Sequence, residues 1–318
     1  MRQITVDELI ELDVDAVNGC VVPCRDGYVM IAGDSRRRRD SYLHRLDRNF
    51  RPVGEATMLD RGPEDHRIAL CEGEYHVWAA YADGVEMRHG VLDTNRGVLD
   101  LSGFEVRDLT PARREKNWCP FVVDGRLRLV YRLFPTLIVL ELRDGDHARI
   151  HEERSPQLYS WALQHLDLEK MIHFGGGSNL VEYKGLRVGT FHAKYPGPRY
   201  RHFLYVMSRQ HQILGIAELE YPDELFSGER LADLTERMRA DGDEAEFLAA
   251  GYRIKLDRVA FSTGLFVERG RFHLSVGVND LVTKLVIIDA RQVDRLIPAR
   301  RRARTCLRMA RSRLRRRR

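Results

Sequence analysis

The chain has 318 residues, of which 43% are hydrophobic, and a formal net charge of +5. This length can bury a large core, in one big domain or two ordinary ones. No apolar run approaches the roughly 18 residues of a membrane span, and the N-terminus lacks the apolar stretch of a secretory signal. The five cysteines are irregularly spaced, so we expect a reduced, cytoplasmic protein.

Residues 1–14 are predicted to form a short helix, because Thr5 followed by Glu8 fits a capping box. The chain then reads as short strands separated by turns that contain glycine. Five hairpins share this design, since such turns often need a positive φ. Their sequences are GCVVPCRDGYVMIAG, RIALCEGEYHVWAAY, FVVDGRLRLVYR, SNLVEYKGLRVGTFH and GLFVERGRFHLSVGV.

Each hairpin is followed by one or two further strand-like runs, and the spacing averages roughly 60 residues, about the size of one four-stranded propeller blade. The pattern therefore predicts an all-β fold, a five-bladed β-propeller over residues 15–290. A large β-sandwich or a pair of β domains is the alternative. Two segments, 155–172 and 222–251, have helical composition and are expected to cap or flank the propeller.

The C-terminal segment, 291–318, is strongly basic. From residue 295 onward it holds twelve arginines and no acidic residue, which leaves 40 basic and 47 acidic residues, a net charge of −7, in the rest of the chain. We expect a basic amphipathic helix that attaches the protein peripherally to an anionic membrane surface, with a disordered tail as the alternative. Its apolar face would consist of Leu296, Ala303, Leu307, Ala310 and Leu314. Nucleic acid is not expected as a partner, because the acidic body offers no matching basic face.

Polar groups recur at the start of the innermost strand of most predicted blades. In a propeller these strands line the central channel, so their first residues converge at one mouth. The groups are Asn18, the run Glu64-Asp65-His66-Arg67, the run Lys116-Asn117-Trp118, Asn179 after three glycines, and Asp280 in VGVND. We predict a site where they meet, while a single charge beside a turn can equally be solvated surface.

The ordered motifs PEDHR, EKNWCPF, GGGSNLV, FHAKY and VGVND resemble those of the five-bladed propellers of glycoside hydrolase family 130, the β-mannoside phosphorylases, and of the related β-mannosyltransferases of glycosyltransferase family 108. The resemblance covers roughly residues 15–290. It implies that Asp65 is the proton donor and that Arg88, Lys116 and His192 contact phosphate. It also implies that Asn18 and Asp280 hold the sugar in the −1 subsite.

Two departures from the family pattern indicate a divergent branch. His66 replaces a proline in the motif that usually reads Glu-Asp-Pro-Arg, which removes a fixed φ and adds a titratable ring beside the predicted acid. Phe174 stands where an arginine often precedes the glycines. The acceptor or substrate can therefore differ from those of the family.

The residue types fit phosphorolysis better than hydrolysis. Hydrolysis of a glycosidic bond needs two carboxylates, whereas phosphorolysis needs one acid, here Asp65, and cations that hold the phosphate. We predict inverting phosphorolysis or transfer of a β-linked hexose, with mannose as the expected sugar. The partners would be an oligosaccharide or sugar phosphate, together with inorganic phosphate or a nucleotide sugar. A glycosyltransferase with a nucleotide-sugar donor and a non-catalytic carbohydrate-binding propeller are the alternatives.

The predicted substrate-binding residues are Asn18, Arg67, Asn117, Trp118, Asn179 and Asp280. Trp118 either stacks on a sugar face or fills the space between blades. For the nearby Phe121 we expect the packing role. No cofactor and no metal site is predicted.

Overall fold

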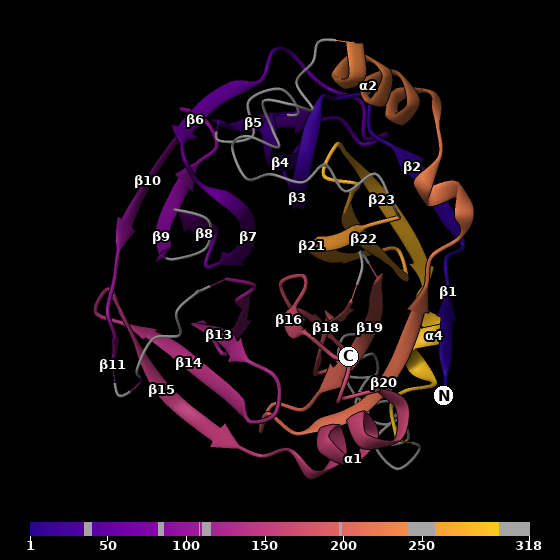
Figure 1. Ribbon diagram of the computed structural model, residues 1–318. Coiled ribbons are helices and arrows are strands. Elements are labelled where there is room, and N and C mark those ends of the chain that lie inside the picture. The colour runs from indigo at the N-terminus through magenta and orange to yellow at the C-terminus, as the bar shows by residue number, and fades with distance from the viewer. Residues whose placement is uncertain are drawn as a thin grey trace, which may run out of the picture.

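The structure is a computed structural model that describes residues 1–34, 40–81, 86–107, 109, 116–196, 199–240 and 258–298, without the side chains of 237–240. Within these ranges the strands form five sheets around a central axis (Figure 1). Each sheet is one blade. Apart from the N-terminal strands and one further short strand, which pair at the outer edges of three sheets, the first strand of each sheet lies nearest the axis. The predicted all-β, five-bladed propeller is confirmed.

The blades follow one another along the chain. Blade 1 consists of β3 (Ala16–Cys24), β4 (Gly27–Asp34), β5 (Asp40–Leu46) and β6 (Thr57–Arg61). Blade 2 consists of β7 (Glu64–Cys71), β8 (Glu74–Tyr81), β9 (Glu86–Asp93) and β10 (Val98–Gly103). Blade 3 consists of β12 (Cys119–Val123), β13 (Arg126–Arg132), β14 (Leu137–Arg143) and β15 (Asp146–Glu153), with β11 (Val106–Arg107) at its outer edge. Blade 4 contains β16 (His173–Gly176), β17 (Val181–Tyr183), β18 (Leu186–Tyr195), β19 (Arg199–Met207) and β20 (Ile213–Glu220). Blade 5 contains β21 (Ala260–Glu268), β22 (Arg271–Val278) and β23 (Val282–Asp289).

The N-terminal segment closes the ring, and the predicted helix over residues 1–14 is wrong. β1 (Gln3–Thr5) pairs in parallel with β20, and β2 (Glu8–Glu11) pairs antiparallel with β23. Ile4 is buried in the core, and the hydroxyl of Thr5 lies 3.3 Å from Gln292 Oε1 instead of capping a helix. The N-terminus thus supplies the outer strands of the last two blades.

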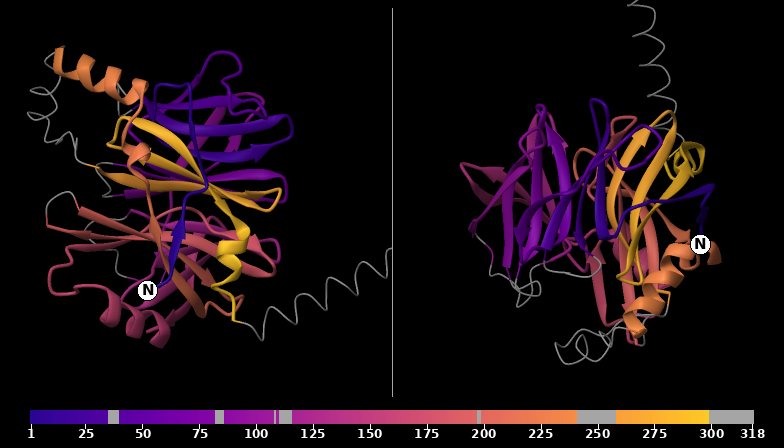
Figure 2. Two further views of the ribbon diagram at one scale, coloured as in Figure 1. Left: turned by 90° about the vertical axis from the view of Figure 1, so that its right-hand side faces the viewer. Right: turned by 90° about the horizontal axis from the view of Figure 1, so that it is seen from above.

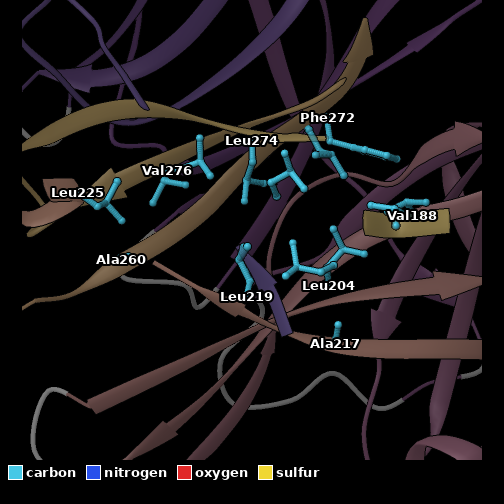
Figure 3. Packing of buried hydrophobic residues seen from close by; sticks show 14 of the residues in the cluster. Val188, Leu204, Ala217, Leu219, Leu225, Ala260, Phe272, Leu274 and Val276 are labelled. Carbon is cyan, nitrogen blue, oxygen red and sulfur yellow. The ribbon is translucent and has the colours of Figure 1, made fainter. Parts of the chain in front are cut away.

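Buried apolar side chains fill the spaces between adjacent blades. In the described part of the chain they form five clusters, one for each interface. Figure 3 shows the cluster between blades 4 and 5, where Leu204 and Leu219 meet Leu274 and Val276. Phe121 is 1% exposed in the cluster between blades 3 and 4, which confirms its packing role.

The two faces of the propeller differ. One face carries tight hairpin turns such as Glu72–Gly73, in which both residues have positive φ. The other face, called the mouth face below, carries the connections between blades. These include the helices α1 (Pro156–His165) and α2 (Glu229–Ala240) and the 3-10 helix η2 (Asp223–Phe226), which lie in the two predicted helical segments. Figure 2 shows α1 and α2 on one side of the molecule and α4 (Ala290–Asp294) toward the other.

The packed body extends beyond the expected boundary at residue 290. After β23 the chain forms α4, and Leu296 and Ile297 are each 3% exposed in the core between blades 4 and 5. Asp294 accepts hydrogen bonds from Tyr183 and Lys184. The rest of the predicted basic helix, from residue 299, lies outside the described residues. None of the helices in the described ranges is long and apolar enough to cross a membrane.

Candidate active site

Local irregularities at the start of the inner strands deliver polar side chains to the mouth. The pairing of β3 with β4 shifts register around Asn18, and that of β7 with β8 shifts around Asp65. Asn18, Asp65 and Asn117 have φ of 51°, 54° and 64°, in the left-handed region that asparagine and aspartate enter more readily than most other residues with a Cβ. Because a bulge leaves its extra residue outside the ladder and re-aims its side chain, Asn18 and Asp65 can face the mouth and not a neighbouring blade.

Asp65 and Lys116 form the centre of the site. Lys116 Nζ lies 3.6 Å from Asp65 Oδ2 and 3.9 Å from Glu64 Oε1. Burial by itself raises the pKa of Asp65, but Lys116 and Arg67 outweigh this effect and hold the pKa below its ordinary value. Asp65 in turn, followed by Glu64 and Asp280, raises the pKa of Lys116. At neutral pH the pair is therefore a carboxylate beside an ammonium group.

Two histidines of blade 4 lie next to this pair. His192 is opposite Gly175 in the ladder of β16 and β18, and its ring centroid is 5.7 Å from that of His173. A Cβ at Gly175 would lie 2.6 Å from His173 Nε2 and 2.8 Å from His192 Nε2, so the glycine makes room for both rings. Burial lowers the pKa of both histidines, and the charge of Lys116 contributes in the same direction. Both rings are therefore neutral at pH 7, and each can donate one hydrogen bond.

Amide side chains complete a ring of polar groups. Asn117 Nδ2 lies 3.5 Å from His173 Nε2, and Asn18 Nδ2 lies 3.4 Å from Asp280 Oδ1. Asp280, in the turn between β22 and β23, also has a positive φ, of 55°. The predicted residues that the structure brings to this mouth are Asn18, Asp65, Lys116, Asn117, His192 and Asp280.

Arg67 and Asn179 instead hold the inner strands to one another. Arg67 is 2% exposed and donates hydrogen bonds to backbone carbonyls of blades 2, 4 and 5, among them those of Gly177 and Ser262. Asn179 exchanges hydrogen bonds of 3.0 and 2.7 Å with the backbone of Leu265. Buried carbonyls and amides near the axis need partners, and these side chains provide them. The structure thus gives both residues a structural role, and their contact with substrate stays a prediction.

Trp118 fills the space between blades 2 and 3. It is 2% exposed, and its ring centroid lies 5.0 Å from that of Tyr131 and 5.6 Å from that of Phe104. The side chain belongs to the buried apolar cluster of this interface. The packing alternative is confirmed. Trp118 also lines the cleft beside Lys116, so substrate contact by this side chain stays a prediction.

Arg88 lies away from the polar ring, on β9, two strands outward from Asp65. Its Nε donates to Glu86 Oε1 at 2.9 Å, and its guanidinium lies 4.1 Å from the ring centroid of Tyr81. The structure therefore does not bring Arg88 to Lys116.

Lys194 and His173 are site residues that the sequence analysis missed. They are opposite one another in the ladder of β16 and β18, and the charge of Lys194 contributes, after burial and Lys116, to lowering the pKa of His173. Lys194 thus supplies a second cation on the blade 4 side. A signal was present in FHAKY, since Lys194 follows His192 by two residues and shares its face of the strand.

A cleft of about 270 Å³ opens beside the polar ring, between blades 3 and 4. Lys116, Asn117 and His173 line its polar part. Phe134 and Phe174, whose stacked rings are 5.1 Å apart, line its apolar part. An apolar wall with a few placed polar groups suits a small organic ligand. Among the described residues no group of three or more His, Cys, Asp or Glu side chains is placed to hold a metal ion.

No protein-family model and no curated protein matches the sequence. Solved structures nevertheless share the fold. A β-1,2-mannobiose phosphorylase from Listeria innocua, in complex with β-1,2-mannobiose, has a TM-score of 0.57 and 11% identity over 92% of this chain and 93% of its own. A mannose phosphorylase from Leishmania mexicana, in complex with phosphate, has a TM-score of 0.51 and 15% identity over 94% and 90%. A glycosyl hydrolase from Bacteroides ovatus has a TM-score of 0.57 and 11% identity over 88% and 86%. The chain is thus a five-bladed β-propeller that matches mannoside phosphorylases and glycoside hydrolases in structure.

Proposed function

We propose that the protein is a carbohydrate-active enzyme that phosphorolyses or transfers a β-linked hexose, with mannose as the favoured sugar. The proposal rests above all on the Asp65–Lys116 pair, 3.6 Å apart at the mouth, with the neutral rings of His173 and His192 beside it. The two phosphorylases of the same fold, named for mannobiose and mannose, support this class of substrate.

In phosphorolysis a phosphate oxygen attacks the anomeric carbon, and the bond from that carbon to the glycosidic oxygen breaks. Asp65, once protonated, gives its proton to the departing oxygen, either directly or through a sugar hydroxyl. Inversion at the anomeric carbon then turns a β-mannoside into α-mannose 1-phosphate and a sugar shortened by one unit. The carboxylate left on Asp65 recovers a proton from water or from the next phosphate.

Phosphate would be held by Lys116 and Lys194 as point charges and by His173 and His192 as hydrogen-bond donors. Lys116 also connects this anion to the acid. Its charge holds the pKa of Asp65 low, and a bound phosphate would offset part of that charge. The pKa of Asp65 would then rise toward the range that a general acid needs. Asp65 would therefore become protonated once phosphate is bound.

A glycosyltransferase is the second candidate, because a nucleotide sugar also presents phosphate at the anomeric carbon. Lys116 and Lys194 suit either donor.

Two incubations across a panel of acceptor sugars separate these candidates, one with mannose 1-phosphate and one with GDP-mannose. Release of inorganic phosphate in the first would support a phosphorylase working in reverse, and release of GDP in the second would support a transferase. No release in either incubation would contradict the enzyme proposal and favour a carbohydrate-binding propeller.

A further inference from the structure

A second cleft, of about 680 Å³, opens on the mouth face in blade 4, and the proposed reaction does not use it. Its lining comes from β1, β19 and β20, from the segment that leads into η2, and from Arg258. It is larger than the cleft beside Lys116 and lies within the range of roughly 300–1,000 Å³ that is usual for ligand pockets.

The second cleft is adjacent to the proposed active site. His202, in its wall, is the cross-strand partner of His192, and the two ring centroids are 6.4 Å apart. Tyr200, also in the wall, has its ring centroid 5.6 Å from that of His192. A ligand in this cleft would therefore lie one strand outward from the phosphate-binding group, close enough to be part of the same extended substrate.

Four of the eleven residues that line the second cleft are aromatic. The rings of Tyr200 and His202 are nearly parallel, with an interplanar angle of 18°, and the ring of Tyr221 lies 4.9 Å from that of His202. Phe226 of η2 adds a fourth ring. Burial lowers the pKa of His202 to about 3, so this ring is neutral at physiological pH. Aromatic side chains with polar tips offer flat apolar faces and hydrogen bonds together, which is what the two sides of a pyranose ring require.

The charges of the second cleft nearly cancel. Arg201 binds Glu218 through two hydrogen bonds of 2.6 and 2.9 Å, and Arg258 pairs with Asp223. Two exposed side chains of opposite sign, Arg199 and Glu220, stand at the rim. This balance contrasts with the cationic group around Lys116 and favours a neutral polyhydroxylated ligand over a phosphorylated one.

We infer that the second cleft binds neutral hexose units of an oligosaccharide, those beyond the unit held at the Asp65 site. The inference rests on the proposed function in two respects, namely the kind of sugar and the assumption that the same oligosaccharide extends into the active site. The binding itself can be measured without turnover.

The experiment is isothermal titration calorimetry of the full chain carrying Asp65→Asn, with β-linked mannobiose and mannotetraose as probes. We expect mannotetraose to bind at least about tenfold more tightly than mannobiose, which corresponds to about 1.4 kcal/mol. Glu220→Trp places a bulky ring at the cleft and should remove this difference. Arg199→Ala should weaken mannotetraose binding about fivefold, through a lost hydrogen bond at the rim.

Matched controls are Glu74→Trp and Arg25→Ala, two exposed positions at turns of the opposite face. These should leave the tenfold difference intact, and thermal melting should show that all variants are folded.

Equal affinities for the two sugars, or a length dependence that survives Glu220→Trp, would overturn the inference. Binding of GDP that Glu220→Trp blocks, without any effect on mannotetraose, would overturn it in favour of a nucleotide subsite. Length-dependent binding without turnover in either donor incubation would support sugar binding in the second cleft and contradict the proposed enzyme activity.

Discussion

Acidification should destabilise the propeller, because several histidines are neutral and buried in the fold. His66 is 1% exposed and hydrogen-bonded to Ser41, while His147 is fully buried and accepts a hydrogen bond from Trp78 Nε1 at 3.1 Å. Burial lowers the pKa of His66 to about 4 and the pKa of both His147 and His202 to about 3. In the unfolded chain each of these groups has a pKa of about 6.5.

The direction in which pH changes the free energy of unfolding follows from proton uptake on unfolding. Between about pH 6.5 and pH 4 the unfolded chain binds more protons than the folded chain, so the free energy of unfolding is highest above this window and falls as the pH falls through it. At pH 5 one such histidine has lost about 2 kcal/mol of stabilisation relative to neutral pH. Three of them together give about 6 kcal/mol, which is comparable with the total of about 5–15 kcal/mol for a typical domain.

Urea titration followed by tryptophan fluorescence, at a series of pH values from neutral to about 5, measures this loss. The variant His147→Gln keeps an acceptor for Trp78 but cannot titrate, so the free energy of unfolding should fall less steeply with acidification. His165→Gln, at a half-buried position in the last turn of α1, is the control for a histidine substitution outside this buried set. A free energy of unfolding that stays constant over this pH range, or a slope that is unaltered in His147→Gln, would refute the reasoning.

Lys116→Met should reduce the use of phosphate or sugar phosphate by about a hundredfold while affecting the acceptor sugar much less, because it removes the cation that contacts the anion. Steady-state kinetics with each substrate varied in turn would show this, and equal losses toward both substrates would argue against an anion-binding role. Trp118→Ala opens a cavity between blades 2 and 3 and should lower the free energy of unfolding by about 3–5 kcal/mol in urea titration; a variant of native stability that no longer binds sugar would favour the stacking role instead. A chain ending at Pro298 should melt like the full chain, whereas one ending at Asp294 loses two buried aliphatic side chains and should be less stable by about 3 kcal/mol or more. The tail is proposed to hold the protein at an anionic membrane surface, so the full chain should sediment with anionic vesicles at low salt and the chain ending at Pro298 should not; equal sedimentation of the two would contradict the attachment.

The repeating hairpins made the fold accessible from sequence, because strand alternation and glycine turns are local signals that recur in every blade. The outer strands contributed by the N-terminus were not accessible in this way. The pairing of Glu8 with Ile287 joins the two ends of the chain, and the capping-box spacing of Thr5 and Glu8 gives a local helix signal that this distant pairing overrides. Local pattern therefore predicted the blades but not how the ring closes.

The site was predictable in part for the same reason. Asp65 and Lys116 open inner strands, and every inner strand starts at the mouth. Which way a polar side chain turns there depends on bulges and register, so Arg67 bonds to buried carbonyls while Asp65, two residues earlier, reaches the mouth. The spacing in FHAKY places Lys194 on the strand face of His192, but only the pairing of β16 with β18 shows that it lies opposite His173.

The most direct test of the central claim, that Asp65 is the acid of a hexosyl-transfer reaction, compares three proteins in whichever donor incubation the unaltered chain performs. The control is Asp144→Asn, at a hairpin turn of the opposite face where φ is 52°, a conformation that asparagine adopts readily. We predict that Asp144→Asn keeps full turnover and that Asp65→Asn melts like the unaltered chain but loses about 10²–10⁴-fold in rate. A folded Asp65→Asn protein that retains more than about a hundredth of the turnover would contradict the account.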